Sequence, residues 1–258
     1  THFFGNVADA KFFSRALDPV ASLPADLPQG SAPILMFVGA IDAYKLDLPM
    51  LEALVAQHPE WNVVLIGPVG ETDPSTDVSG LERFPNVYLL GPKPYEVLPS
   101  YLAQADVALL PLQLNDYTRH MYPMKFFEYL AAGRVVVATA IPSLQDQADV
   151  ALLCRDDVEA FSTAIHRALS GDAPGLEMRL ERAQQHTYIV RTQRMLAMLQ
   201  RHGLLPPEPS PPQAHPYHNV RSRLRWSWLQ AQGWLSLVWL LERFRATWLA
   251  KRLLMNAL

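Results

Sequence analysis

Most of the chain alternates short, continuous apolar runs with segments whose apolar residues recur at helical spacing. The runs are rich in Val, Ile and Leu, which is typical of strands buried on both faces of a parallel sheet. We expect strands at 34–38, 63–66, 87–90, 107–112, 135–139 and 150–153. Helical spacing predicts helices over 47–58, 95–105, 158–169 and 175–203. This order predicts an α/β fold built on a doubly wound, Rossmann-like parallel sheet of about six strands.

One short helix between the fourth and fifth predicted strands has both of its ends marked. Pro123 suits the first helical position, where the fixed φ of proline helps and its missing N–H costs nothing. Gly133 suits the position just after the last turn, where a left-handed backbone is needed. The free N–H groups at the start of a helix favour anions, so we expect a phosphate there. Lys125 lies in that first turn, and Glu128 follows one turn later on the same face.

The sequence of this helix and of the strand after it resembles a known donor-binding motif. The motif is that of the GT-B glycosyltransferases, in particular family 4 and its bacterial exopolysaccharide relatives, and the residues that carry it are PMKFFEYLAAG followed by RVVVAT. The resemblance implies that Glu128 binds the ribose of a nucleotide sugar and that Lys125 lies near its diphosphate, with Pro123 and Met124 beside them. A surface ion pair between Lys125 and Glu128 is the alternative, and the marked ends of the helix favour the binding site.

The position eight residues before Glu128 departs from the family pattern. Many members carry a second glutamate there, whereas this chain has His120. We expect His120 to contact the sugar or the diphosphate, since an imidazole can donate or accept a hydrogen bond. Asn115 and Thr118, in the polar loop just before it, are further candidates for the same contacts, with a solvated loop as the alternative for each.

Two more segments follow strands at the same edge of the predicted sheet. Gly39 comes directly after the first strand, where a glycine lets the backbone approach a ligand, and Lys45 lies six residues later. GT-B donor domains resemble this segment, except that Ala40 stands in place of their arginine. We expect Lys45 to extend toward a phosphate as a point charge, with an ordinary loop lysine as the alternative. Tyr95, after the third strand, is expected either to stack on the nucleobase or to pack against neighbouring side chains.

Composition excludes several classes of protein. The 258 residues carry a net charge of −3, which gives no overall basic field, so a nucleic-acid partner is not expected. The single cysteine, Cys154, excludes an internal disulfide, and its apolar surroundings predict a buried, inert thiol. Neither a signal peptide nor a membrane-spanning apolar segment is found, so we expect a cytoplasmic location. No metal ion or cofactor is predicted.

The pattern divides the chain into four parts. Residues 1–32 resemble the connector between the two halves of a GT-B enzyme, which implies that an acceptor domain precedes Thr1. Residues 33–203 form the predicted donor-binding domain, and 204–218 form a proline-rich linker. Residues 219–258 are basic and hold five of the six tryptophans. This composition predicts an amphipathic helix that lies on an anionic inner-membrane surface or packs on a protein partner.

Together these observations predict the donor-binding half of a GT-B glycosyltransferase of cell-surface polysaccharide synthesis. A hexose-type residue would pass from a nucleotide-diphosphate sugar, most readily a UDP-sugar, to a glycan or lipid-linked acceptor. Lys45, Lys125 and the helix start would stabilise charge on the leaving diphosphate in place of a metal ion. The general base is expected on the acceptor domain. Two alternatives remain open: a GT-B sugar-nucleotide epimerase, and a non-catalytic module that docks on a membrane or a partner.

Overall fold

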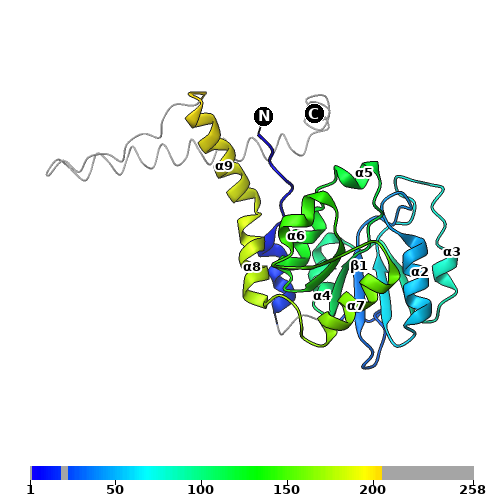
Figure 1. Ribbon diagram of the computed structural model, residues 1–258. Coiled ribbons are helices and arrows are strands. Elements are labelled where there is room, and N and C mark those ends of the chain that lie inside the picture. Colours follow the sequence, from blue (N-terminus) through cyan, green and yellow to red (C-terminus); the bar gives the residue numbers. More distant parts are fainter. Residues whose placement is uncertain (1, 19–22, 205–258) are drawn as a thin grey trace. The chain divides into compact units, whose positions relative to one another are not determined.

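Six parallel strands form the centre of the part of the chain that the computed structural model describes, residues 2–18 and 23–204 (Figure 1). They are β1 Ile34–Val38, β2 Asn62–Ile66, β3 Val87–Gly91, β4 Val107–Leu110, β5 Val135–Thr139 and β6 Leu152–Cys154. Their order across the sheet is β3-β2-β1-β4-β5-β6, with every neighbouring pair parallel. The order reverses between β1 and β4, which confirms the predicted doubly wound sheet and marks the edge where such sheets bind ligands.

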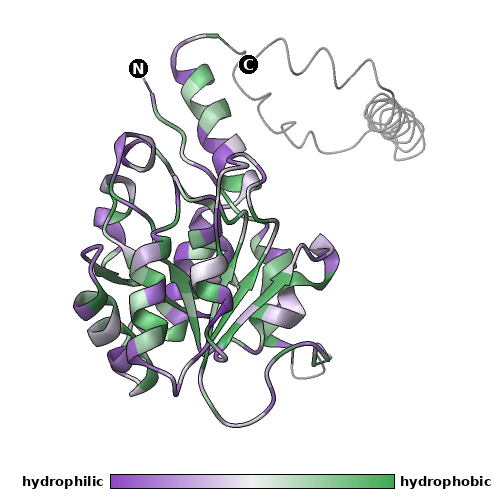
Figure 2. Ribbon diagram, turned by 90° about the vertical axis from the view of Figure 1, so that its right-hand side faces the viewer, coloured by the Kyte–Doolittle hydropathy of each residue, from purple (hydrophilic) through white to green (hydrophobic). Residues whose placement is uncertain are grey.

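Helices cover both faces of this sheet (Figure 1). The α-helices are α1 Ala10–Phe13, α2 Leu48–Gln57, α3 Ser79–Glu82, α4 Leu98–Leu102, α5 Asp116–Arg119, α6 Met124–Ala131, α7 Val158–Leu169, α8 Leu176–Gln185 and α9 Tyr188–Arg201. Shorter 3-10 turns are η1 Ser14–Leu17, η2 Tyr95–Val97 and η3 Pro142–Gln147. α2 packs beside α7, whereas α6 packs against α1 and α8. Figure 2 shows hydrophobic strands at the centre, enclosed by helices that turn hydrophilic residues outward.

Four strands have bounds other than those predicted: β2 begins one residue earlier, at Asn62, β3 ends one residue later, at Gly91, and β4 and β6 differ more. β4 stops at Leu110, because the next residue is Pro111, which has no N–H to continue the ladder. β6 starts at Leu152 rather than at Val150. The amides of Val150 and Ala151 both donate to the carbonyl of Gln147, so these residues close the turn after η3 instead of joining the sheet.

The helix predicted over 175–203 is two helices, α8 and α9. The break falls at His186 and Thr187, where the amide of Ala8 donates to the carbonyl of His186 at 2.9 Å. Thr187 then caps α9, with its hydroxyl accepting from the amide of Val190 at 3.3 Å. The N-terminal segment therefore pairs with the chain between these helices, a long-range contact that periodicity within 175–203 cannot show.

The structure describes most of the N-terminal residues 1–32 but not the residues after Leu204. Residues 1–32 contain α1 and η1, which the sequence analysis did not predict, and Phe13 of α1 is buried in the core. Its helix is capped by Asp9, which accepts from the amide of Phe12 at 2.9 Å. The predicted linker beyond Leu204 and the basic, Trp-rich helix 219–258 lie outside the described residues and stay predictions. Within the described residues, no helix is long and apolar enough to cross a bilayer.

Candidate functional site

The predicted site centres on α6, and both ends of this helix are fixed by its neighbours. At its C-terminus Gly133 has a φ of +72°, its amide donates to Leu130, and the amide of Arg134 donates to Tyr129. These two bonds form the Schellman motif that a left-handed glycine permits. The buried Tyr129 hydroxyl accepts from the amide of Val38 at 2.7 Å and donates to its carbonyl at 3.2 Å. α6 is therefore tied to the end of β1.

The N-terminus of α6 has no side-chain cap. Pro123 was predicted to be the first helical residue. In the structure it is the extended N-cap just before the helix, with φ −72° and ψ 113°. A proline side chain has no acceptor for the first amides of the helix, so these donors are left for another partner. Met124 is the first helical residue, and its sulfur lies 3.8 Å from the hydroxyl of Tyr188 on α9.

Lys125, in this first turn, forms an ion pair with Glu128 one turn later. Lys125 Nζ lies 2.9 Å from Glu128 Oε2. The Glu128 side chain is buried, with 5% exposed, whereas 31% of the Lys125 side chain is exposed. Gly39 lies against the pair, since a Cβ at that position would be 3.8 Å from Lys125 Cε. The structure thus brings together three of the predicted residues, and the burial of Glu128 distinguishes this pair from the surface ion pair that was the alternative.

Tyr95 lies beside Glu128 but is packed against α1. Its ring stacks on Phe12 with centroids 4.6 Å apart and meets the edge of Phe13 at 5.7 Å. Burial raises the pKa of the Tyr95 hydroxyl to about 12, and the negative charges of Glu128 and Asp9 add to the effect. One face of the ring is therefore already occupied by protein, which favours the packing alternative over stacking on a nucleobase.

Lys45 is held by a residue that the sequence analysis did not single out. Its ammonium lies 3.0 Å from Oδ2 of Asp42, a carboxylate with 0% exposure. Asp42 also accepts from the hydroxyl and amide of Thr72 and from the amide of Asp73. Burial alone would raise the pKa of Asp42, but these hydrogen bonds and Lys45 lower it to about 2. Neither Lys125 nor Glu128 is a hydrogen-bond or ion-pair partner of Lys45 among the described residues, so the predicted approach of Lys45 to a phosphate stays a prediction.

Asn115 and Thr118 hold the loop before α6 rather than face a ligand. The Asn115 side chain accepts from the amides of Tyr117 and Thr118 at 3.0 Å each and donates to the carbonyl of Tyr44 at 2.7 Å. Thr118 is fully buried, and its hydroxyl bonds the carbonyl of Gln113. The two residues form a capping box on α5. Their side chains are therefore engaged in holding this turn, which favours the structural alternative over contacts with the donor.

His120 is the C-cap of α5. Its Nδ1 lies 2.9 Å from the carbonyl of Asp116, so Nδ1 carries the proton and Nε2 is left to accept. The ring lines a cavity of about 860 Å³ between the N-terminal segment and α9. Of the residues predicted to bind the donor, none but His120 lines this cavity among the described residues.

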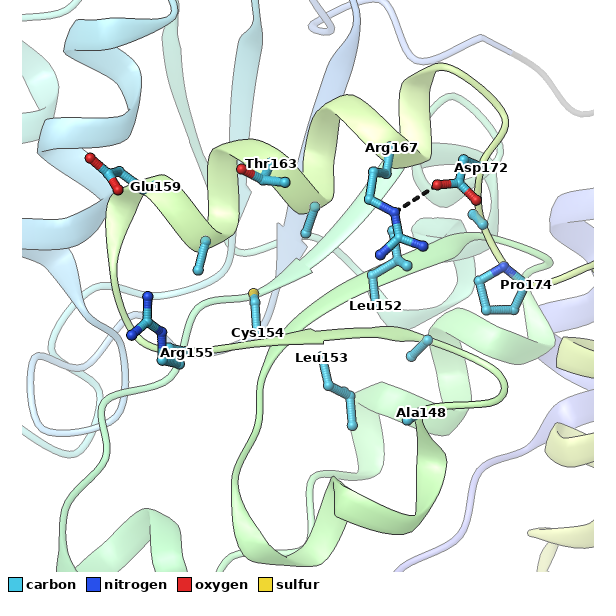
Figure 3. A pocket seen from close by; sticks show the side chains of 14 residues that line it. Ala148, Leu152, Leu153, Cys154, Arg155, Glu159, Thr163, Arg167, Asp172 and Pro174 are labelled. Carbon is cyan, nitrogen blue, oxygen red and sulfur yellow. Dashed lines mark hydrogen bonds and ion pairs between the residues drawn. The ribbon is translucent and has the colours of Figure 1, made fainter.

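A second cavity, of about 640 Å³, lies between β6 and α7 (Figure 3). Figure 3 shows Leu152 and Cys154 on the face of β6 toward α7, with the ion pair of Arg167 and Asp172, 2.7 Å apart, at one end. Burial raises the pKa of the Cys154 thiol to about 12, so the thiol stays protonated, in agreement with the predicted inert cysteine. None of the predicted donor-binding residues lines this cavity.

Two residues near the site were missed by the sequence analysis. Asp42 could have been noticed as an acid three positions before Lys45, a spacing that allows a local ion pair. Tyr188 begins a helix far along the chain, and nothing in its neighbourhood points to Met124. A contact such as that between Tyr188 and Met124 depends on how α8 and α9 pack on α6, which local sequence does not show.

Comparison with known proteins gives a family and a set of structural neighbours. The family profile described as glycosyl transferases group 1 matches residues 32–171. A protein of Bacillus subtilis (strain 168), provisionally named teichuronic acid biosynthesis glycosyltransferase TuaH, is 36% identical over 110 residues. This match covers 43% of the chain and 27% of the relative. The chain thus spans about a quarter of that relative's length.

Solved structures share the fold. The sucrose-phosphate synthase of Thermosynechococcus elongatus matches with a TM-score of 0.61 and 24% identity, over 79% of this chain and 53% of that one. The E. coli trehalose-6-phosphate structure bound with UDP-2-fluoro glucose matches at 0.55 and 18%, over 79% and 51%. Anabaena HepE in complex with UDP matches at 0.52 and 14%, over 65% and 48%. The chain spans about half the length of these proteins, and at such identities the likeness shows the fold alone.

Proposed function

The chain belongs to the glycosyl transferases group 1 family, and we propose that it is the donor-binding half of an enzyme that transfers a sugar from a nucleotide-diphosphate sugar. One observation carries the proposal: a buried Glu128 is paired at 2.9 Å with Lys125, which lies in the uncapped first turn of α6. This turn lies at the edge of the sheet where β1 ends at Val38, next to Gly39. Because neighbours of the same fold are bound to UDP or to a UDP-sugar analogue, UDP is the first nucleotide to test.

The start of α6 supplies what a leaving diphosphate needs. The first amides of the helix have no side-chain acceptor, and the helix dipole places partial positive charge at the same point. The partly exposed Lys125 adds a full positive charge beside them. Negative charge that builds on the diphosphate as the sugar leaves would be stabilised by these groups, without a metal ion, before any rearrangement of the protein.

Glu128 would fix the ribose. A carboxylate accepts hydrogen bonds from two neighbouring hydroxyls, and bonds to a charged acceptor are about twice as strong as neutral ones. Because Glu128 is buried and tied to Lys125, its direction is set before the nucleotide arrives. The same lysine would then touch both the carboxylate and the diphosphate, which fixes the distance between ribose and phosphates.

For the acceptor, we propose a polysaccharide or a lipid-linked glycan. TuaH is named for teichuronic acid biosynthesis, which supports a polysaccharide or lipid-linked glycan as the acceptor. The basic segment 219–258 is proposed to hold the protein at the cytoplasmic face of the membrane, where such acceptors are exposed. The general base is proposed to lie outside this chain, so the chain alone should bind the donor and turn over nothing.

Titration calorimetry with UDP, GDP and ADP tests the donor site. We expect one of the three to bind, and Glu128→Gln to weaken it by about 10- to 100-fold, which corresponds to the loss of hydrogen bonds to a charged group. Glu82→Gln, an exposed glutamate on α3, is the matched control and should leave the affinity unchanged. Circular dichroism of both variants excludes unfolding as the cause.

Two results would contradict the proposal in different ways. Equal affinity of the Glu128→Gln variant and the unsubstituted protein would remove Glu128 from the site but leave nucleotide binding intact. Failure of all three nucleotides to bind the folded chain would refute donor binding itself. That second result would favour the docking-module alternative, which requires no nucleotide.

A further inference from the structure

The cavity of about 860 Å³ beside His120 is formed by four segments that are far apart in the sequence. Its walls come from the N-terminal segment 3–7, the loop 119–122, the η3 turn and the segment 185–194, which runs from the end of α8 into α9. Lys125 and Glu128 do not line it. The cavity therefore adjoins the proposed donor site without being part of it, and it needs an explanation of its own.

Positive charge dominates the lining of this cavity. Arg119, Arg191 and Arg194 line it, against one acidic side chain, Asp146. Arg119 is paired with Asp116 at 3.2 Å. Arg191 and Arg194 lie one turn apart on α9 and make no ion pair with any residue in the described part of the chain. Two guanidinium groups without carboxylate partners, at the wall of a cavity, are suited to bind a phosphate or a carboxylate.

Another part of the lining is aromatic. Tyr122 meets the edge of Phe3 at 5.7 Å and stacks on Phe127 at 5.6 Å, and Phe127 in turn stacks on His186 at 4.1 Å. Gly5 lets the N-terminal segment lie against this wall, because a Cβ there would be 2.7 Å from the Tyr122 ring. Because Phe127 and the backbone at Gly5 lie against the Tyr122 ring, the aromatic side chain open to the apolar face of a ring-shaped ligand is Phe3, which lines the cavity and is 78% exposed.

Neutral polar groups complete the lining. Gln145 from η3 and Gln185 from the end of α8 both reach the cavity with amides that can donate and accept. His120 adds an imidazole whose Nε2 is left to accept. A ligand that fits all three kinds of wall has an anionic group, an apolar ring face and several hydroxyls.

We propose that this cavity is a second binding site, which takes a sugar bearing a phosphate or a carboxylate group. The anionic group lies on Arg191 and Arg194, and the ring packs against Phe3. The site binds its ligand whether or not a nucleotide occupies the start of α6. It therefore does not depend on the proposed function, and the two can be tested separately.

Binding is measured by calorimetry on the whole chain with four probes: glucose 1-phosphate, glucuronate, glucose and inorganic phosphate. We expect glucose 1-phosphate or glucuronate to bind at least ten times more tightly than either glucose or phosphate. Whichever of the two binds better identifies the anion. The double substitution Arg191→Ala/Arg194→Ala should weaken that ligand at least tenfold, and it should leave the affinity for UDP unchanged.

The matched control is Arg155→Ala/Arg167→Ala, which removes two arginines that line the cavity beside β6. This variant should bind the anionic sugar as the unsubstituted protein does. Equal affinity for glucose and for both anionic sugars would overturn the proposal, as would unchanged binding by the Arg191→Ala/Arg194→Ala variant. Competition between UDP and the anionic sugar would show one shared site and would also overturn it. Phosphate that binds as tightly as glucose 1-phosphate would reduce the cavity to a simple anion site and refute sugar recognition.

Discussion

Replacement of Asp42 by asparagine isolates the charge of a fully buried carboxylate. The carboxylate accepts from Lys45 Nζ at 3.0 Å, from the Thr72 hydroxyl at 2.7 Å, and from the amides of Thr72 and Asp73 at 3.1 Å each. Asparagine keeps the shape, and its Oδ1 can still accept from both amides. Its Nδ2, however, turns hydrogens toward the Lys45 ammonium, so Lys45 loses its anion.

The size of the effect follows from the pKa of Asp42. The hydrogen bonds lower this pKa from 3.8 to about 2, which corresponds to about 2 kcal/mol of folding stability. Because the pKa is lower in the folded state, this stability is present above pH 3.8 and is lost as the pH falls toward 2. We therefore expect Asp42→Asn to lower the free energy of unfolding by about 2 kcal/mol at pH 7, and by progressively less below pH 4.

Urea unfolding followed by far-UV circular dichroism measures this difference at pH 7, 5 and 3. Fluorescence is less suitable, since five of the six tryptophans lie in 219–258. Asp116→Asn is the matched control, because Asp116 pairs with Arg119 at 3.2 Å but is exposed, and it should have little effect at any pH. A loss for Asp42→Asn that stayed constant down to pH 3 would refute the reasoning, since it would show that shape rather than charge is responsible.

Two further predictions concern the attachment of α6. Gly133→Ala should lower the free energy of unfolding by about 1–2 kcal/mol, because a φ of +72° strains any residue with a Cβ. The new Cβ would also lie 2.5 Å from Leu17 Cδ2, and a thermal melt that was unchanged would contradict this account. Tyr129→Phe should cost about 1–3 kcal/mol in urea unfolding, since it leaves the buried amide of Val38 without its acceptor. Tyr88→Phe, a partly exposed tyrosine on β3, provides the control for that change.

The fold was predictable from the sequence because the strands carry a strong local pattern. The run Val135–Thr139 is continuous, branched and bounded by Gly133, and the structure has β5 at those residues. Where the prediction missed, a hydrogen bond outside the pattern decided the outcome. Val150 is as apolar as any strand residue, but its amide is already bonded to Gln147, so hydropathy could not exclude it from β6.

The candidate site was predictable only where its residues share one helix. Lys125 and Glu128 are three positions apart on α6, so their contact follows from helix geometry once the helix is recognised. Lys45 lies on a loop, and its partner depends on how the segment at Thr72 folds over Asp42. Thr118 lies in a polar stretch and was predicted to contact a ligand, but in the structure it is completely buried in the capping box of α5. Loop residues thus carry too little local pattern to place their side chains.

The burial of Glu128 is the feature that ties fold and site together. Removing a carboxylate from water is expensive, and a protein retains one only where nearby charge or donors offset the cost. Here Lys125 and the positive end of α6 provide that offset. Neither would suffice if the helix could shift, which is why the Schellman turn at Gly133 and the Tyr129 bond to Val38 matter to the site. The same anchoring keeps the uncapped start of α6 near the end of β1, where the proposed diphosphate would meet both the helix and Lys125.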